Sequence, residues 1–168
     1  MEAQSLGSIL KKTVEASFPL LQSQLDNDKS SKAPAPGKWS PKQLIGHLID
    51  SASNNHQRFV RANFKEDLCF PGYLQEEWVE LQDYQHMDWS ELLVLWRSFN
   101  LLIAEVMTKT PLEKLIQARE EHDLDKIAFY RIPSDQPATL AYFMEDYIKH
   151  LEHHIVQILP NYQPLIPK

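Results

Sequence analysis

Residues 139–159 read TLAYFMEDYIKHLEHHIVQIL, a stretch with the pattern of a long amphipathic helix that ends before Pro160. Its apolar residues share one helical arc: Leu140, Phe143, Met144, Tyr147, Ile148, Leu151, Ile155 and Ile158. Because a helix turns about 100° per residue, His154 falls within this arc and His150 at its edge, whereas His153 points away. The stretch therefore predicts a core-facing helix that presents two histidines, at positions i and i+4, to the interior.

This histidine pair has two interpretations. The i, i+4 spacing is the one by which a single helix offers two imidazoles to one metal ion, as in H-x-x-x-H zinc sites. The alternative is a pair of structural histidines that are hydrogen-bonded, since buried imidazoles need polar partners. Four further histidines are predicted to be surface or loop residues: His56, His86, His122 and His153.

The clearest helix start in the sequence lies at Ser40. Ser40 can cap the helix, Pro41 suits the first helical position and Gln43 completes a capping box, so a helix is predicted from residue 41 to about residue 63. A polar strip runs beside its apolar arc: His47, Ser51, Asn54 and Arg58. Such a strip is typical of a helix that lines an internal cavity, which makes His47 a third candidate ligand. Asp50 rotates off this strip.

Two further stretches, residues 5–26 and 89–108, have helical periodicity, and Asp88 is the predicted cap of the second. Four long amphipathic helices predict an all-α fold, a four-helix bundle that occupies residues 1–168 as a single domain. Residues 65–87 and 109–137 form two longer irregular connections, and loops of this length tend to be functional. Within them we expect a short helix over 76–81 and a short strand over 127–130.

Composition excludes several classes of protein. The chain has 168 residues, of which 43% are hydrophobic, and a net charge of −6, which argues against nucleic acid as a partner because binding it needs a basic footprint. The sequence shows neither a signal-peptide pattern nor an apolar run near the ~20 residues that cross a bilayer, so we expect a cytoplasmic protein without a membrane partner. The one cysteine, Cys69, excludes an internal disulfide and is expected to be buried, with Asp67 raising its pKa.

Two motifs together resemble the DinB/YfiT-like superfamily. Residues 39–48, WSPKQLIGHL, resemble its W-S-x-x-x-x-x-x-H segment, and residues 147–154, YIKHLEHH, with Gln157 and Ile158, resemble its closing H-x-x-x-H helix. The resemblance covers nearly the whole chain. It implies a four-helix bundle, often dimeric, so a homodimer is expected. It also implies one divalent metal ion, with His47, His150 and His154 as its ligands. Nickel or zinc is expected in preference to manganese or iron.

Three imidazole ligands leave at least one coordination position open, which is typical of catalytic rather than structural sites. The open position could hold water, which a metal converts to hydroxide for hydrolysis, or a thiolate. By resemblance we favour transfer of a low-molecular-weight thiol to a small electrophile. The alternatives are a metal-dependent hydrolase and a metal-binding protein without catalysis. Asn54 and Arg58 are the candidate substrate-binding residues, and Asp146 is a candidate hydrogen-bond acceptor that orients an imidazole ligand.

Overall fold

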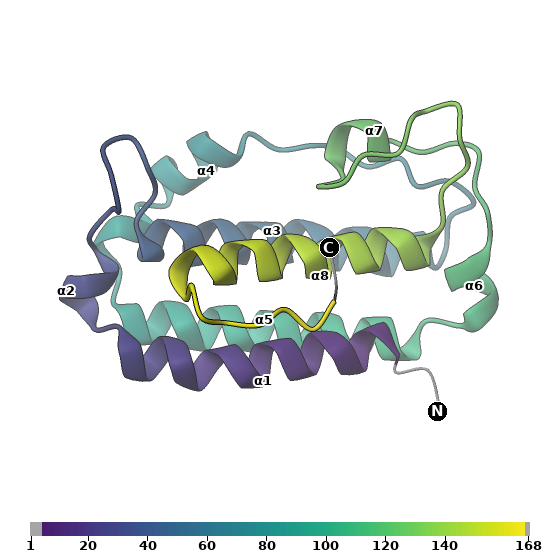
Figure 1. Cartoon of the computed structure of the whole chain (residues 1–168). Helices are drawn as coiled ribbons and strands as arrows, with labels where there is room; N and C mark the ends of the chain where they lie inside the picture. The colour runs from purple at the N-terminus through teal and green to yellow at the C-terminus, as the bar shows by residue number, and fades with distance from the viewer. Residues whose placement is uncertain (1–4, 167–168) are drawn as a thin grey trace.

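The computed structural model describes residues 5–166 and contains four long helices (Figure 1). These are α1 (Leu6–Gln24), α3 (Pro41–Ala62), α5 (Trp89–Lys109) and α8 (Leu140–Ile158). Helix α1 packs against α5 and α8, and α3 packs against the same two helices, so the order around the bundle is α1, α5, α3, α8. The predicted four-helix bundle is confirmed, and α3 and α8 are neighbours within it.

Short helices occupy the connections between the long ones. They are α2 (Asn27–Ser30), α4 (Gln75–Leu81), the 3₁₀ helix η1 (Tyr84–His86), α6 (Leu112–Ile116) and α7 (Leu124–Ile127). Figure 1 shows α4 and α7 above α3, on the side of the bundle away from α1 and α5. The helix predicted over 76–81 is thus confirmed as α4, and both long connections contribute segments to one side of α3.

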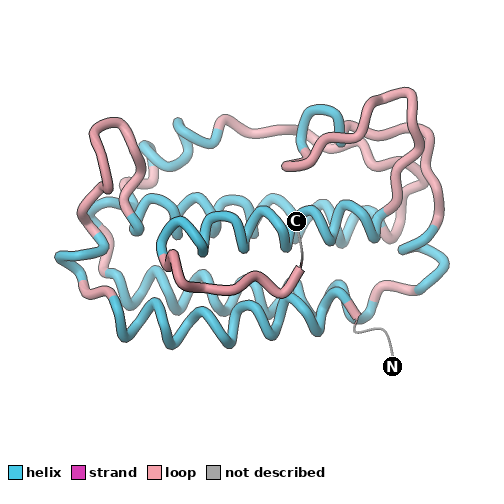
Figure 2. Tube along the Cα trace, viewed as in Figure 1, coloured by secondary structure: helices cyan, strands magenta, loops and turns pink. Residues whose placement is uncertain are grey.

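The strand predicted over 127–130 is wrong. Figure 2 shows helices joined by loops, and residues 5–166 contain isolated bridges but no strand. Ile127 ends α7, and the backbone N–H groups of Phe129 and Tyr130 donate to the two carboxylate oxygens of Asp146, at 2.8 and 2.7 Å. A side chain therefore satisfies the donors that a strand would pair with a neighbouring strand.

Side-chain caps set the starts of the helices that build the site. At α3 the capping box is present, with Gln43 N donating to Ser40 Oγ at 3.3 Å and Ser40 N donating to Gln43 Oε1 at 3.0 Å. Asp88 accepts from two backbone N–H groups at the start of α5, and Thr139 accepts from one at the start of α8. These caps satisfy donors that a helix N-terminus leaves without partners.

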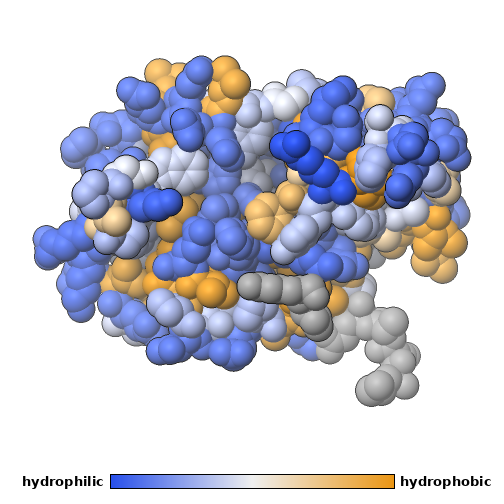
Figure 3. Space-filling view, turned by 45° about the horizontal axis from the view of Figure 1, so that its top comes forward, coloured by the Kyte–Doolittle hydropathy of each residue, from blue (hydrophilic) through white to orange (hydrophobic). Residues whose placement is uncertain are grey.

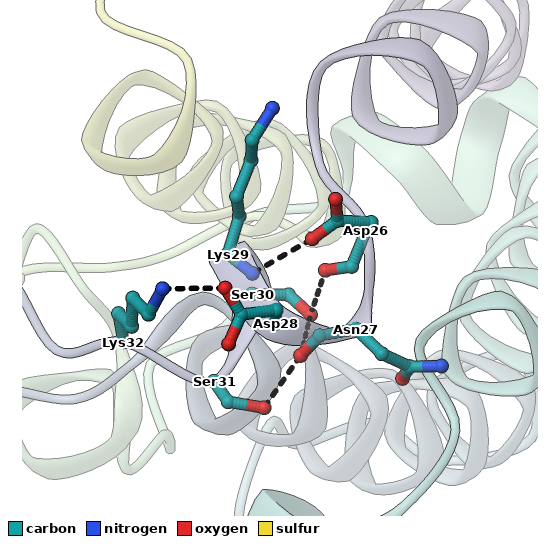
Figure 4. Close-up of polar contacts among 7 residues, drawn as sticks. All are labelled: Asp26, Asn27, Asp28, Lys29, Ser30, Ser31 and Lys32. Atoms are coloured by element: carbon teal, nitrogen blue, oxygen red, sulfur yellow. Dashed lines mark hydrogen bonds and ion pairs between the residues drawn. The ribbon is translucent and has the colours of Figure 1, made fainter.

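Helix α2 is a single turn held by its own polar side chains (Figure 4). Asp26 caps it by accepting from Lys29 N at 2.8 Å, and the Ser30 hydroxyl donates to the Asp26 carbonyl at 2.6 Å. Asn27 ties the turn to the bundle, because its Oδ1 accepts from Trp89 N at 2.8 Å at the start of α5. The turn therefore sets where the chain leaves α1 and approaches α3.

Aromatic side chains join α3 to α8 in the two turns of α8 that precede its histidines. The Phe59 ring meets those of Phe143 and Tyr147 edge to face, with centroids 5.4 and 5.8 Å apart. Tyr147 is buried and donates to Asn100 Oδ1 on α5 at 2.5 Å. Such contacts restrict the rotation of α8 about its axis, and hence the direction in which its histidines point.

Buried Glu152 lies between His150 and His154 in the sequence of α8, and its carboxylate stabilises the fold. Its carboxylate accepts from the Thr13 hydroxyl at 3.0 Å and from the backbone N–H groups of Leu165 and Ile166 at 2.8 and 3.2 Å. The C-terminal segment, yellow in Figure 1, is thereby held against the bundle.

One face of the molecule is mostly polar (Figure 3). Hydrophilic residues dominate the face drawn in Figure 3, where hydrophobic residues form scattered patches. Within the described range no helix combines the length and hydrophobicity that a membrane span requires.

Candidate metal centre and adjoining cavity

Three histidines from two helices converge at one point. His47 comes from α3, and His150 and His154 come from α8. Nε2 of His150 lies 3.1 Å from Nε2 of His47 and 3.1 Å from Nε2 of His154, and the three candidate ligand atoms all lie within 4.8 Å of one another. The structure therefore brings together the two histidines that helical phase selected and the third that the family resemblance supplied.

The arrangement of the ring nitrogens fits a divalent cation. Imidazole nitrogens bind zinc at about 2.0–2.1 Å in tetrahedral sites, which separates two such nitrogens by roughly 3.3 Å, close to the 3.1 Å in the two pairs that His150 forms. A metal requires neutral imidazoles. Burial lowers the pKa of His47 to about 3, holds the pKa of His150 well below 6.5 and lowers that of His154. All three rings are thus neutral at pH 7, and lone pairs are available for a cation.

Gln157 determines which nitrogen of His154 carries the proton. Its Oε1 lies 2.8 Å from Nδ1 of His154, and an amide oxygen can only accept, so Nδ1–H donates and Nε2 presents its lone pair to the cluster. The amide Nε2 of Gln157 lies 3.1 Å from Nε2 of His153, which accepts from it and holds the amide in this orientation. Sequence analysis gave Gln157 no role, although it stands three residues after His154 and four after His153, the spacing of helical neighbours.

Replacing Gln157 with leucine is expected to weaken metal binding by about ten- to a hundredfold, the usual effect of losing the acceptor that orients a metal-binding histidine. Competition with a chromogenic chelator measures this affinity. Gln157→Glu, which keeps an acceptor, should retain most of the binding, and Gln163→Leu on the exposed C-terminal segment is the matched control. Equal affinities for wild type and Gln157→Leu would contradict the assigned role.

His47 and His150 have different surroundings. The ring of buried His47 packs beside the Trp39 indole, with centroids 5.1 Å apart, and its Nδ1 is buried without a hydrogen-bond partner among the described residues. The His150 ring contacts the Phe129 ring, at a centroid distance of 5.3 Å. Aromatic rings therefore shield the cluster on two sides, which accounts for the desolvation that lowers the histidine pKa values.

The lowered pKa of His47 predicts how the metal-free protein responds to acid. The unfolded chain binds a proton near pH 6.5 and the folded chain only near pH 3, so this histidine contributes stability above pH 6.5 that is lost as the pH falls. Between pH 7 and pH 5.5 the contribution should fall by about 1 kcal/mol. Urea unfolding at both pH values measures it. His47→Gln should show a smaller difference between the two pH values than wild type, and equal differences would contradict the prediction.

Asp146 does not have the partners that sequence analysis gave it. Its two oxygens accept from the backbone of Phe129 and Tyr130, and no hydrogen bond joins it to an imidazole within residues 5–166. Because Phe129 contacts the rings of both His150 and His153, Asp146 instead holds the loop that covers the cluster. Helical phase placed Asp146 one turn before His150 but carried no information on the loop that packs against it.

A cavity of about 570 Å³ adjoins the histidine cluster. Helix α3 contributes His47, Ser51, Asn55 and Arg58 to its wall. Helix α8 contributes Phe143, Asp146, Tyr147 and His150, and residues 72–77, residues 126–129 and Arg131 form the remainder. Two of the three histidines therefore border a space in which a small molecule could reach them.

Of the two predicted substrate-binding residues, Arg58 lines the cavity and Asn54 does not. The Asn54 amide donates back to the Asp50 carbonyl of its own helix at 2.9 Å, and the neighbouring Asn55 takes its place in the wall. Asn54 lies at one edge of the predicted strip and Asn55 lies beyond its other edge, and periodicity alone could not show on which side the cavity opens.

The other reactive side chains lie outside the cluster. His86 is exposed and pairs with Asp83, whereas His122, predicted as a surface or loop residue, is a buried loop residue whose Nε2 lies 2.7 Å from the Gln136 carbonyl. Cys69 is partly buried, and burial together with Asp123 and Asp67 raises the pKa of its thiol. A protonated thiol is a poor nucleophile, so the cluster is the better candidate for chemistry.

Residues 12–158 match the DinB superfamily, and this match includes all three histidines. The chain belongs to the DinB superfamily. Two bacterial relatives carry the name "Putative metal-dependent hydrolase". The one from Oceanobacillus iheyensis is 36% identical over 83 residues, 49% of this chain and 44% of that protein. The one from Bacillus cereus is 29% identical over 122 residues, 73% of this chain and 64% of that protein. The matches thus span less than two thirds of either relative's length.

Two solved structures share the overall fold of this chain. YfiT from Bacillus subtilis, described as "a probable metal-dependent hydrolase with an unusual four-helix bundle topology", superposes with a TM-score of 0.73 at 20% identity, covering 95% of this chain and 89% of YfiT. The mycothiol-dependent maleylpyruvate isomerase gives 0.60 at 11% identity, over 93% of this chain and 59% of the isomerase. At these identities the likeness establishes the bundle fold.

Proposed function

We propose that this protein is a metal-dependent enzyme that transfers a low-molecular-weight thiol to a small electrophile. The observation that carries the proposal is the convergence of three neutral imidazoles at the edge of a cavity of about 570 Å³. Three protein ligands are the number found in catalytic zinc sites, whereas structural sites use four. A superposable fold in a mycothiol-dependent isomerase supports a thiol as co-substrate.

Each residue of the site has a defined task in this proposal. His47, His150 and His154 would hold the cation, and their nitrogen donors suit nickel or zinc better than magnesium or calcium. Gln157 keeps the His154 lone pair directed at the cluster. Asp146 holds Phe129 over His150, which limits the access of water. A cation bound there would act as a Lewis acid that favours the ionised, nucleophilic form of a thiol or of water.

Hydrolysis is the second candidate function, because the named relatives are called metal-dependent hydrolases. The same three histidines would serve it, and the two reactions differ in their nucleophile. A hydrolase would cleave esters or amides without an added thiol. A thiol transferase would consume the thiol and the electrophile in equal amounts.

A paired assay separates these functions. Zinc- and nickel-loaded protein is incubated with a fluorogenic alkylating agent and a panel of thiols, and in parallel with chromogenic esters without thiol. We expect thiol-dependent turnover that His154→Ala abolishes and His86→Ala leaves unchanged. Ester cleavage without thiol, lost in the same variant, would assign the hydrolase instead. Metal-loaded protein that turns over neither panel would contradict catalysis.

A further inference from the structure

Arg58 is a buried cation whose partners are both neutral. Its side chain is 5% exposed. One terminal nitrogen donates to the Pro71 carbonyl at 2.7 Å, and the other donates to Asn55 Oδ1 at 3.3 Å. No carboxylate of residues 5–166 forms a salt bridge with it. A guanidinium has five N–H donors, so further donors remain for a ligand in the cavity that Arg58 lines.

This arrangement is costly without an anion. Removing a charged group from water costs several kcal/mol unless an opposite charge or a full set of hydrogen bonds compensates it. Burial lowers the pKa of Arg58, yet a guanidinium stays protonated at any physiological pH. An anion bound in the cavity would provide the missing compensation.

The other charged residues of the cavity neither neutralise Arg58 nor provide a second buried cation. Glu76, Glu77 and Arg131 are exposed, and Lys126 is exposed and pairs with Asp123 at 3.2 Å. Asp146 is buried, but both its oxygens already accept backbone N–H groups. Arg58 is therefore the cavity cation best placed to bind an anion away from solvent.

The distance from Arg58 to the histidine cluster defines the length of the ligand. His47, Ser51, Asn55 and Arg58 lie on one side of α3 and all line the cavity. Eleven residues at 1.5 Å each separate the Cα atoms of His47 and Arg58 by roughly 16 Å. The guanidinium donates to Asn55, one turn earlier in α3, so it lies over the turn that faces the cluster and closer to it than the Arg58 Cα atom. The hydroxyl of Ser51 and the amide of Asn55 lie between the two ends.

We propose that Arg58 binds the oxyanion, a carboxylate or a phosphate, at the far end of an extended ligand whose reacting group lies at the histidine cluster. This proposal rests on the proposed function and specifies its substrate class. Asn55 holds the guanidinium in place through Oδ1, while its Nδ2 donates to the carbonyl and the hydroxyl of Ser51 at 3.0 and 3.3 Å. The planar guanidinium matches an oxyanion with two parallel hydrogen bonds, which lysine cannot reproduce.

The test uses straight-chain hydroxamates, which chelate a metal at one end, on the zinc-loaded protein. One series ends in a methyl group, a second in a carboxylate and a third in a phosphonate, each with four to ten intervening carbons. Calorimetry gives the affinities for wild type, Arg58→Lys, Arg58→Met and, as the matched control at the cavity mouth, Arg131→Met. Thermal unfolding establishes that each variant is folded.

In wild type we expect hydroxamates with an anionic end to bind at least about tenfold more tightly than those that end in a methyl group. This factor corresponds to one charge-assisted hydrogen bond of about 1.5 kcal/mol. The gain should peak at one chain length, shrink in Arg58→Lys, vanish in Arg58→Met and persist in Arg131→Met. A larger gain for carboxylate than phosphonate, or the reverse, identifies the oxyanion. If no hydroxamate binds, the metal site itself is contradicted. If hydroxamates bind without any anionic gain in wild type, or the gain depends on Arg131, the Arg58 proposal is overturned.

Discussion

Replacing His150 with alanine is expected to abolish stoichiometric metal binding, lowering the affinity for zinc by more than about a hundredfold. His150 is central to the cluster, because its Nε2 lies 3.1 Å from the Nε2 atoms of both other histidines. Without it two imidazoles on different helices remain, and a divalent ion loses one of its three protein ligands. Elemental analysis after dialysis and competition with a chromogenic chelator measure the loss.

His86→Ala is the control for this variant, since His86 is exposed and hydrogen-bonded to Asp83. It should bind metal as wild type does. Circular dichroism should show that His150→Ala keeps its helices, because the substitution changes no residue of the hydrophobic core. One equivalent of zinc bound to folded His150→Ala with wild-type affinity would rule out the three-histidine site.

The second large effect is expected from Gly46→Ala, which should lower the free energy of unfolding by about 3 kcal/mol through overpacking. A Cβ at Gly46 would lie 2.1 Å from Cδ2 and 2.2 Å from Cγ of the Tyr84 ring. Tyr84 has no room to move, because it is 2% exposed and its hydroxyl donates to Asp50 Oδ1 at 2.7 Å. The usual gain from replacing glycine with alanine in a helix, about 1 kcal/mol, has the opposite sign.

Urea unfolding of Gly46→Ala and Gly72→Ala gives a matched comparison. At Gly72 the nearest atom to an added Cβ is Ile127 Cγ2 at 3.9 Å, an ordinary contact, so Gly72→Ala should change stability little. Because Gly46 precedes His47 in α3, the same substitution should also weaken metal binding. A Gly46→Ala protein as stable as wild type would show that Tyr84 does not pack against α3 as described.

Helical phase predicted the parts of the fold and the site that depend on neighbours within one helix. The capping box at Ser40 and Gln43 predicted the start of α3, and the apolar arc of residues 139–159 predicted α8. The same arc predicted that His150 and His154 face inward and that His153 faces away. His47 was only a candidate from its polar strip until the family resemblance paired it with α8, since spacing within one helix cannot show which helix lies opposite.

Two features that the sequence did not predict depend on segments distant in the chain. Residues 127–130 have the composition of a strand, but Ile127 ends α7 and residues 128–130 form an irregular loop, because Asp146 on α8 accepts the N–H groups of Phe129 and Tyr130. Asn55 rather than Asn54 lines the cavity because residues 72–77, residues 126–129 and Arg131 close it on that side. A one-residue error rotates a side chain by about 100°, enough to move it out of a cavity wall.

The central claim is that three histidines hold the metal and leave coordination positions open toward the cavity. The X-ray absorption spectrum of the zinc-loaded protein tests it most directly, because it counts the imidazole ligands and detects sulfur. We predict three imidazoles, no sulfur, and one or two further light atoms that an added thiol or hydroxamate replaces. A spectrum with four protein ligands, with sulfur from Cys69, or with fewer than three imidazoles would contradict the account.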